Sequence, residues 1–319
     1  MIIETKLKFI RGGLITSFQG SQIKKFQHQG ITTGGPMDNF LSKIGNITLS
    51  NSEDSICFEI CKLGPIIQIV KGKFIFLISG NIHFNIKTKN GIIEGESHQS
   101  YEVNKGDIIE INDTIDSNYA YLVFKGKIKN INDKNLTSSI ISSSLGLNNG
   151  NKIYDEDIFS INTISKFKHR KIIINLNNYY NKNIRVINGP QMNYFKIKDI
   201  RNFFQKKFKI SKNLNRVGIR LLNNPIRPMF SSKFTSEGII RGSIQVPSDG
   251  NPIILTAEHP TIGGYPKIAS IIMADFCKIS QLIEGSFFNF EQVSIKIAEN
   301  EIHKFNKKLI NLKKNIVYL

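Results

Sequence analysis

The chain has 319 residues and a formal net charge of +18 at pH 7, and it is long enough for one large domain or two ordinary ones with buried cores. No apolar run approaches the ~18 residues of a membrane span, and the first residues lack the apolar stretch and cleavage site of a signal peptide. Three cysteines, an odd number, argue against a disulfide framework. We therefore expect a cytoplasmic protein with no membrane partner.

The remaining composition argues against two further classes of function. Cys57 and Cys61 are four residues apart, but no second Cys or His pair follows at ligand spacing, so no metal site is expected. The lysines are spread along the whole chain with Ile and Asn, and no basic block alternates with stacking aromatic residues. Overall charge of this kind supports only non-specific attraction, so no nucleic-acid partner is expected.

In chain order, most of the predicted elements are strands. Apolar runs of four to eight residues, rich in Ile and Phe and bounded by Gly, Pro, Asn or Asp, recur from "KLKFI" near the start to "SFFNFEQVSI" at 286–295. Their spacing is typical of barrels or sandwiches rather than of alternating βαβ units. Apolar periodicity predicts helices at 36–50, 194–208 and 274–282. The predicted fold class is therefore mainly β with a few helices, a β-rich α+β protein.

Two halves of similar pattern are also predicted. The Asn- and Ser-rich stretch 135–152 is interpreted as a connection. Residues 57–80 and 235–257 each carry a Glu, then a Gly, then an Ile-Gln-aliphatic strand, a turn and a second apolar strand. This echo favours two related domains, 1–150 and 151–319. Chance similarity between Ile-rich strands is the alternative.

Composition changes between residues 216 and 275. Six of the nine prolines lie there, together with four arginines: Arg216, Arg220, Arg227 and Arg241. Lysine cannot replace the planar fork of arginine at a carboxylate or phosphate, and only proline fixes its own backbone angle. The stretch is therefore interpreted as the functional region, with a tightly turned structural region as the alternative.

Four stretches resemble one known family. They are "GGPMDNFLSKIGN" at 34–46, "NGPQMNYF" at 188–195, "NRVGIRL" at 215–221 and the long block at 236–275 that contains "AEHPTIGGYPK". The family is the biotin-dependent carboxyltransferase-like group, also called allophanate hydrolase subunit 2 or KipA. The motifs stand in family order and together span nearly the whole chain. The resemblance implies two cyclophilin-like β-barrel domains.

One motif departs from the family. The usual A-D-x-Q-T-T-G-G-Y-P stands here as "AEHPTIGGYP", so that Glu258, Pro260 and Ile262 replace Asp, Gln and Thr. A carboxylate is kept, while an amide and a hydroxyl are lost. This departure leaves the identity of the substrate open, more than the fold.

The resemblance also implies partners and cofactors. Family members include the C subunit of ATP-dependent 5-oxoprolinase, which opens 5-oxoproline to glutamate with a B subunit (allophanate hydrolase subunit 1 or KipI-like) and an A subunit of the lactam-utilisation type. ATP with Mg would then be bound in the complex.

Two alternatives stay open. The first is a KipA-type regulator that antagonises a kinase inhibitor. The second is the carboxyltransferase component of a biotin-dependent, urea-type carboxylase. The sequence has no biotin carboxylase-like region and no Met-Lys-Met biotinylation sequence, so biotin would enter only on a separate carrier.

Opening an unstrained lactam with ATP requires donors for phosphate charge, a group for proton transfer and glycines where the backbone approaches the substrate. The residues that match these needs as candidate catalytic groups are Glu258, His259 and Arg216. The candidate substrate- or nucleotide-binding residues are Arg220, Gln245, Thr261, Gly263, Gly264, Tyr265, Asp38 and Glu237.

Several of these residues have a structural alternative. Glu258 can pair with an arginine of the same domain, His259 can be a surface loop residue, and the two glycines can form a tight turn before the next strand. For Asp38, complementing the start of a helix is favoured over catalysis. Strand alternation in 215–221 predicts Arg216 and Arg220 on one face, with Val217, Ile219 and Leu221 toward the core.

Overall fold

The computed structural model describes the chain except for residues 1, 24, 130–135, 165, 181–182 and 230–234. The chain forms two compact units. Unit 1 comprises Met1–Ile23, Gly34–Ile174 and Lys308–Leu319, and unit 2 comprises Lys24–Thr33 and Asn175–Lys307. Residues 158–164 belong to unit 1, because this strand pairs along its whole length with the first strand of the chain.

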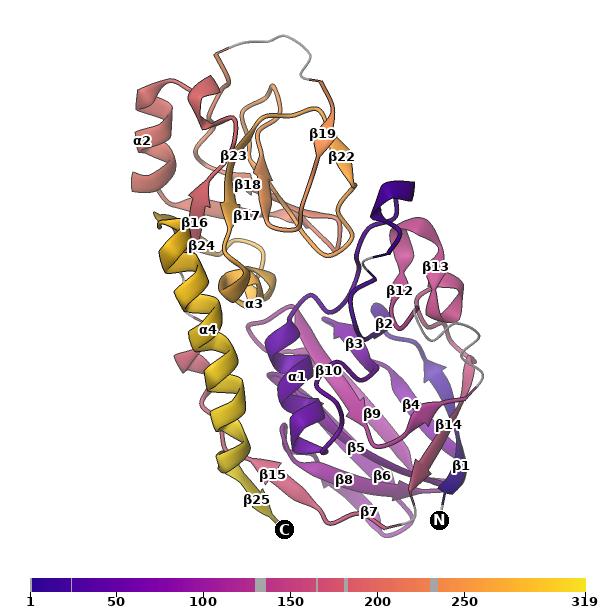
Figure 1. Cartoon of the computed structure of the whole chain (residues 1–319). Helices are drawn as coiled ribbons and strands as arrows, with labels where there is room; N and C mark the ends of the chain where they lie inside the picture. The colour runs from indigo at the N-terminus through magenta and orange to yellow at the C-terminus, as the bar shows by residue number, and fades with distance from the viewer. Residues whose placement is uncertain (1, 24, 130–135, 165, 181–182, 230–234) are drawn as a thin grey trace. The chain divides into compact units, whose positions relative to one another are not determined.

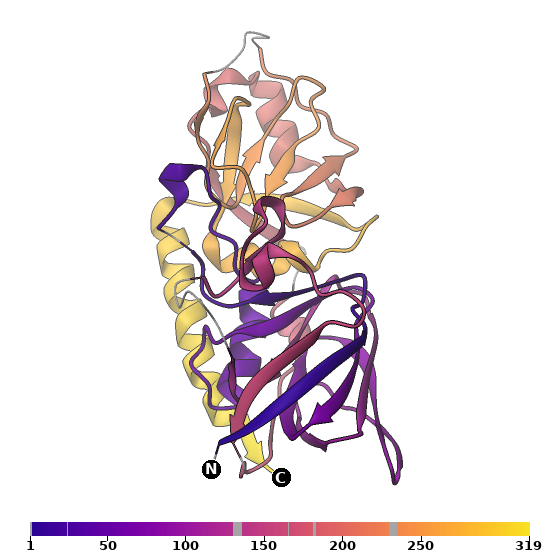
Figure 2. The same ribbon diagram turned by 90° about the vertical axis from the view of Figure 1, so that its right-hand side faces the viewer.

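Unit 1 is built from two antiparallel sheets. The larger has seven strands: β11 (Lys127–Ile128), β14 (Ile158–Ile164), β1 (Ile2–Arg11), β4 (Ile66–Lys71), β9 (Ile108–Thr114), β6 (Ile82–Thr88) and β7 (Gly91–Glu94). The smaller has five: β2 (Ile15–Gln19), β3 (Cys57–Cys61), β10 (Tyr119–Phe124), β5 (Lys73–Ser79) and β8 (Ser100–Asn104). Figure 2 shows β1 and β14 side by side. Aromatic and aliphatic side chains of both sheets form one core.

Smaller elements complete unit 1. Helix α1 (Asn39–Thr48) packs on β10 and β5 of the five-stranded sheet. Two short pairs are β12 (Ser139–Ile140) with β13 (Leu145–Gly146), and β15 (Arg170–Ile172) with β25 (Ile316–Tyr318). Single-turn 3-10 segments are η2 (Ile141–Ser143), η3 (Leu147–Gly150) and η7 (Lys313–Asn315). The stretch predicted as a connection, 135–152, contains only such short elements where it is described.

Unit 2 contains a closed barrel of seven strands (Figure 1). Its order is β16 (Asn183–Asn188), β23 (Lys267–Ile271), β20 (Ser243–Gln245), β21 (Ile253–Leu255), β18 (Gly218–Leu222), β17 (Phe208–Leu214) and β24 (Phe287–Gln292). Only the β16–β24 pairing is parallel among the described strands. Buried Ile, Val, Leu and Phe side chains of the barrel and of helix α2 (Ile197–Gln205) fill its core.

Outside the barrel strands, β19 (Glu237–Gly238) pairs with β22 (Ile262–Gly263). The helices are α3 (Phe276–Gln281) and α4 (Ile295–Leu312), and further 3-10 segments are η1 (Gln27–Gln29), η4 (Leu176–Asn178), η5 (Met192–Tyr194) and η6 (Met273–Asp275). No helix within the described ranges is both long and apolar enough to span a bilayer.

The structure confirms a mainly β chain with few helices. A closed barrel is present in unit 2 alone among the described strands, since unit 1 pairs its strands in two separate sheets. The echo is not a shared topology: β4 and β5 lie in different sheets, whereas β20 and β21 are barrel neighbours. Helix α4 was not predicted, and its buried residues are Leu309 and Leu312.

Close packing of α1 on the five-stranded sheet requires a glycine. A Cβ at Gly45 would lie 2.5 Å from Val123 Cγ2 and 3.3 Å from both Leu77 Cδ1 and Ser79 Cβ. We expect Gly45→Ala to lower the free energy of unfolding by about 1–3 kcal/mol, the usual cost of overpacking. This cost exceeds the helix propensity that Ala gains over Gly, at most about 1 kcal/mol. Urea unfolding measures the difference.

The matched control is Gly238→Ala, since a Cβ there meets no atom within 4 Å. That variant should unfold as the wild type does. Equal stability of Gly45→Ala and the wild type would show that α1 shifts away from the sheet at no cost.

Candidate functional site

The turn at Asn215 brings two of the predicted catalytic residues together. Asn215 Oδ1 accepts hydrogen bonds from Val217 N (2.8 Å) and Gly218 N (3.1 Å), and Thr256 Oγ1 donates to Asn215 O at 3.0 Å. Such a side-chain turn is characteristic of Asn. It lies where β18 and β21 stop pairing. Glu258 N then donates to Arg216 O at 2.6 Å, which places residues 216 and 258 side by side.

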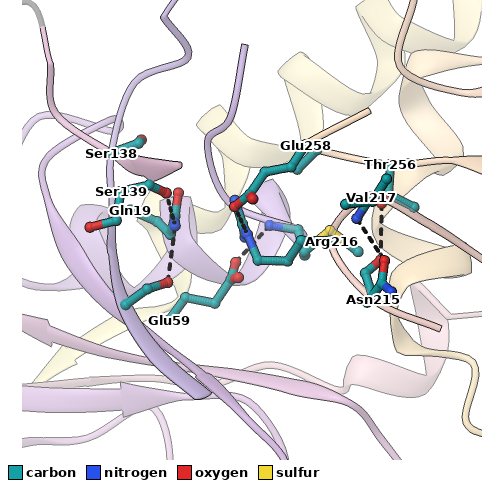
Figure 3. A network of polar contacts seen from close by, with 12 residues as sticks. Gln19, Glu59, Ser138, Ser139, Asn215, Arg216, Val217, Thr256 and Glu258 are labelled. Atoms are coloured by element: carbon teal, nitrogen blue, oxygen red, sulfur yellow. Dashed lines mark hydrogen bonds and ion pairs between the residues drawn. The ribbon is translucent and has the colours of Figure 1, made fainter. Parts of the chain in front are cut away.

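Arg216 and Glu258 form a buried ion pair. Figure 3 shows the two side chains pointing toward one another, with Arg216 Nε donating to Glu258 Oε1 at 2.5 Å. Their side chains are only 7% and 2% exposed. A charge-assisted hydrogen bond at this depth compensates two charges that would otherwise be costly to bury. The pairing of Glu258 with an arginine of its own domain, left open by the sequence, is therefore present.

His259 follows directly and is buried rather than a surface loop residue. Its Nδ1 lies 2.7 Å from Pro260 O, and because a carbonyl oxygen only accepts, Nδ1 is the protonated nitrogen of the neutral ring. Loss of hydration lowers the pKa of His259 below its usual value, and the charge of Arg241 adds to this, against the opposing hydrogen bond to Pro260. His259 is thus held neutral, with Nε2 bearing the lone pair.

The predicted alternation across 215–221 is wrong at its start. Val217 is 39% exposed and Arg216 is buried, while Ile219 and Leu221 are buried as predicted. The reason is the Asn215 turn, because β18 begins only at Gly218 and strand alternation does not apply before it. Arg220 lies on β18 and pairs with the half-exposed carboxylate of Asp249. Arg216 and Arg220 therefore do not share one anion site in this chain.

A second group of polar residues gathers where β19, β22 and the start of β23 meet. Glu237 Oε2 accepts hydrogen bonds from Lys267 Nζ and from Gln191 Nε2, both at 2.8 Å. Gln245 Nε2 reaches Tyr265 O at 3.4 Å, and Gly263 pairs with Glu237 across the β19–β22 ladder. A Cβ at Gly263 would lie 2.4 Å from Ile239 Cδ1 and 2.8 Å from Gln245 Nε2, so any other residue there would displace the ends of these two side chains.

The other binding candidates of unit 2 contribute less directly. Thr261 accepts at its carbonyl from Ile239 N, which extends the β19–β22 ladder. Gly264 is half-buried and Tyr265 is exposed in the turn before β23. The structure thus divides the predicted site into an Arg216–Glu258–His259 group and a Glu237–Gln245–Gly263 group. Sequence reasoning missed Gln191 and Lys267. The sequence feature that could have indicated Lys267 is a lysine at the start of an apolar strand within the long motif block.

Asp38 belongs to unit 1 and caps helix α1. Its carboxylate accepts from Phe40 N (3.0 Å) and Leu41 N (3.1 Å), which is the helix-terminus role favoured by the sequence. Asp38 N donates to the hydroxyl of Tyr121, and that hydroxyl donates to Glu59 Oε2, each at 2.7 Å. Burial, and then the charges of Glu59 and Asp38, raise the pKa of Tyr121 well above its usual value.

These residues belong to a polar row across the five-stranded sheet. Ser17 is the register partner of Glu59, Glu59 that of Tyr121, and Tyr121 that of Ser79. Directly paired residues of an antiparallel sheet point to the same face. Glu59 also accepts from Met37 N at 2.6 Å, so the row holds the loop that leads into α1. We assign this row a structural role.

Two further features of the described residues concern ligands. A pocket of about 600 Å³ in unit 1 is lined by residues of β6, β7 and β9 and the turn after β9, including His83, Glu94 and Asp113, and contains no predicted site residue. Within the described ranges, no group of three or more His, Cys, Asp or Glu side chains is arranged to hold a metal ion.

Comparison with known proteins places this geometry in a family. Residues 29–292 match the carboxyltransferase domain, subdomains A and B. The chain is 28% identical to the 5-oxoprolinase C subunit of Haemophilus influenzae over 86% of this chain and 88% of that protein. It is 25% identical to the C subunit from Escherichia coli over 92% and 93% of the two chains. The urea amidolyase of K. lactis has the same fold, with a TM-score of 0.84 and 22% identity over 98% of this chain and 21% of that enzyme.

The buried ion pair predicts a large effect on stability. We expect Glu258→Gln to lower the free energy of unfolding by about 3 kcal/mol, because removal of one charge leaves a buried guanidinium without full compensation. Asp249→Asn is the control within unit 2. It removes a carboxylate from the more exposed Arg220 pair and should cost at most about 1 kcal/mol. Urea unfolding of both variants measures these losses of unfolding free energy. Equal losses in the two variants would contradict a buried Arg216–Glu258 ion pair.

The neutral state of His259 predicts a pH effect of defined sign. The unfolded chain takes up a proton as pH falls below about 6.5, and the folded chain resists it until the lowered pKa is reached. Stability is therefore lost as pH falls through this window. His98 in unit 1, whose buried ring has a pKa of about 4, adds a loss of the same sign.

The contribution of His259 alone to this pH dependence is the difference between the stability that the wild type loses on acidification and the stability that His259→Gln loses. We expect this variant to lose less stability between pH 7.5 and pH 5.5, measured by urea unfolding. His28→Gln, at an exposed position, is the control. An unchanged pH slope in His259→Gln would show that the folded chain protonates this ring as readily as the unfolded chain does.

Proposed function

This chain belongs to the family of carboxyltransferase domains with subdomains A and B, and from that premise we propose that it is the C subunit of an ATP-dependent 5-oxoprolinase. The observation that carries the proposal is the end-to-end match: the chain covers 88% and 93% of the two 5-oxoprolinase C subunits. It covers 21% of the urea amidolyase with the same fold. Similarity over nearly the whole length of a stand-alone subunit supports that assignment more than similarity to one part of a larger enzyme.

In this proposal the chain works with a B subunit and an A subunit to open 5-oxoproline to glutamate, in a cytoplasmic complex. The reaction breaks an unstrained amide, so it requires activation of the amide oxygen and a group that moves protons to and from water and nitrogen. His259 is the proposed proton acceptor, because Nδ1 is committed to Pro260 O and Nε2 carries the lone pair. Glu258 is the proposed proton-transfer partner beside it, positioned by Arg216.

The described residues of this chain do not fit ATP as its main binding site. Arg216, Arg220 and Lys267, the basic residues of the candidate site, each pair with a carboxylate of the same unit. A triphosphate with Mg needs cations and carboxylate ligands that are available to it. We therefore propose that a partner subunit holds ATP and Mg, and we route no step of the reaction through nucleotide bound to this chain.

Two other functions keep specific support. The fold shared with urea amidolyase supports a carboxyltransferase component that receives the carboxyl group from a separate biotin carrier. The altered motif supports a KipA-type regulator, since Pro260 and Ile262 replace an amide and a hydroxyl, and Ile262 is exposed. An exposed apolar side chain at that place suits a binding surface better than lactam chemistry.

Reconstitution tests the proposal. The chain is coexpressed with its B and A subunits, and glutamate release from 5-oxoproline is followed with and without ATP. We expect turnover that depends on ATP and on all three subunits. The positive control is the Escherichia coli set assayed in parallel. If that control turns over and the set containing this chain does not, the proposal is wrong. Recovery of a biotinylated protein with the purified chain would instead support the carboxyltransferase function.

A further inference from the structure

Lys267 is a buried cation whose neutralising carboxylate is exposed. The Lys267 side chain is 8% exposed, whereas that of Glu237 is 54% exposed. A lysine is almost never buried without a partner, because its charged form loses hydration there. The anion that compensates this buried charge therefore comes from the surface of unit 2.

The two side chains that donate hydrogen bonds to this anion, Lys267 and Gln191, are positioned by contacts between β23 and the segment after β16. Lys267 begins β23, and Gln191 follows the end of β16, the strand that pairs with β23. Lys267 N donates to Gln191 Oε1 at 3.0 Å, which orients the amide so that Gln191 Nε2 is directed at Glu237. Gln191 N also donates to Lys267 O at 3.3 Å. A Cβ at Gly189 would lie 2.2 Å from Lys267 O, so the close approach of these two segments requires glycine.

The two donors converge on one oxygen atom. Lys267 Nζ and Gln191 Nε2 both lie 2.8 Å from Glu237 Oε2. An ammonium and an amide N–H that meet at one point form a binding position for a carboxylate oxygen. The hydrogen bond to Lys267 and then that to Gln191 lower the pKa of Glu237, as expected for a carboxylate held as an anion.

Glu237 itself is weakly held. It lies on β19, a strand of two residues whose partner β22 also has two. One further backbone hydrogen bond, from Ile239 N to Thr261 O, extends this ladder, which is still short. The carbonyl of the neighbouring Gly238 accepts from Lys267 Nζ at 3.3 Å, while a Cβ at Gly238 would meet no atom within 4 Å and both Ile240 and Ile262 are exposed. In contrast, Glu258 and Asp275, which pair with Arg216 and Arg185, are buried.

We propose that Lys267 and Gln191 form a carboxylate-binding site of unit 2, and that Glu237 occupies it as an internal ligand which a small carboxylate displaces. The chemical class of ligand is a small organic acid, such as a lactam acid or an aliphatic carboxylate. That this acid is the substrate of the complex rests on the proposed function. The existence of the site does not, because it concerns binding to this chain alone.

Removal of the internal carboxylate should strengthen binding of an external one. A tethered group competes at an effective concentration in the millimolar range, so its loss should tighten apparent affinity by about tenfold or more. The probes are 5-oxoproline, acetate and 2-pyrrolidinone, which is the same lactam without a carboxylate. Binding to the full chain is measured by isothermal titration calorimetry at low salt, without ATP or other subunits.

Four variants carry the test. We expect Glu237→Ala to bind 5-oxoproline or acetate about tenfold more tightly than the wild type, and the double variant Glu237→Ala with Lys267→Met to lose that gain. Asp249→Ala, which removes a carboxylate from the more exposed Arg220, is the control and should show no gain. Should Glu237→Ala fail to fold, Glu237→Gln removes the charge while keeping the hydrogen-bonding shape, and it should show a smaller gain.

Each outcome decides between displacement and a fixed ion pair. Preference for 5-oxoproline over acetate assigns the site to a lactam acid, and equal affinity assigns it to carboxylates in general. No gain in Glu237→Ala or Glu237→Gln, or equal binding of 2-pyrrolidinone, would overturn the proposal. Because no turnover is measured, a failed reconstitution of 5-oxoprolinase activity does not alter these results.

Discussion

The neutralisation of buried positive charge is the constraint on which the structure of unit 2 depends. Arg185 shows it most fully: its backbone N and Nε donate to Asp275 Oδ2, both at 2.9 Å, and its Nη2 donates to Asp275 Oδ1 at 2.7 Å. Lys278 Nζ lies 2.9 Å from the same carboxylate, which is fully buried. Arg185 Nη1 also pairs with Glu301, so the carboxylate of a helix outside the barrel is tied to a barrel strand. Removal of the Asp275 carboxylate would abolish its ion pairs with both Arg185 and Lys278 and leave positive charge that is costly to bury.

This constraint explains where carboxylates had to be placed in a chain with far more Lys and Arg than Asp and Glu. Most of the lysines are exposed and need no partner. Buried Arg216 and Lys267, and partly buried Arg185, each pair with a carboxylate distant in sequence: Arg216 with Glu258, Lys267 with Glu237 and Arg185 with Asp275. In unit 1, buried carboxylates are satisfied by hydrogen-bond donors. There two buried carboxylates, Asp38 and Glu59, accept hydrogen bonds from backbone N–H groups and from Tyr121.

The sequence predicted the elements whose patterns are local. Helices α1, α2 and α3 fall within the three predicted stretches, because apolar residues recur at helical spacing there. It did not predict what depends on distant partners. The place of β14 in unit 1 is set by its pairing with β1, and helix α4 was not predicted. Burial of Arg216 follows from the turn at Asn215, which interrupts the alternation of 215–221. Motif identity therefore located the candidate site, whereas pairing of charges could be read only from the folded chain.

The ion pairs of unit 2 differ in whether the carboxylate can be exchanged for another ligand. An ion pair with both members buried is fixed, because exchange of the carboxylate for water or another ligand would first require exposure of both side chains. Arg216–Glu258 is of this kind. In the Lys267–Glu237 pair the Lys267 side chain is buried to a similar extent. The Glu237 side chain is exposed to solvent and belongs to a strand that forms only two residue pairs with its partner. Exchange there needs movement of only one exposed side chain. The position of the carboxylate, rather than the depth of the cation, thus determines which of these pairs is suited to admit a ligand.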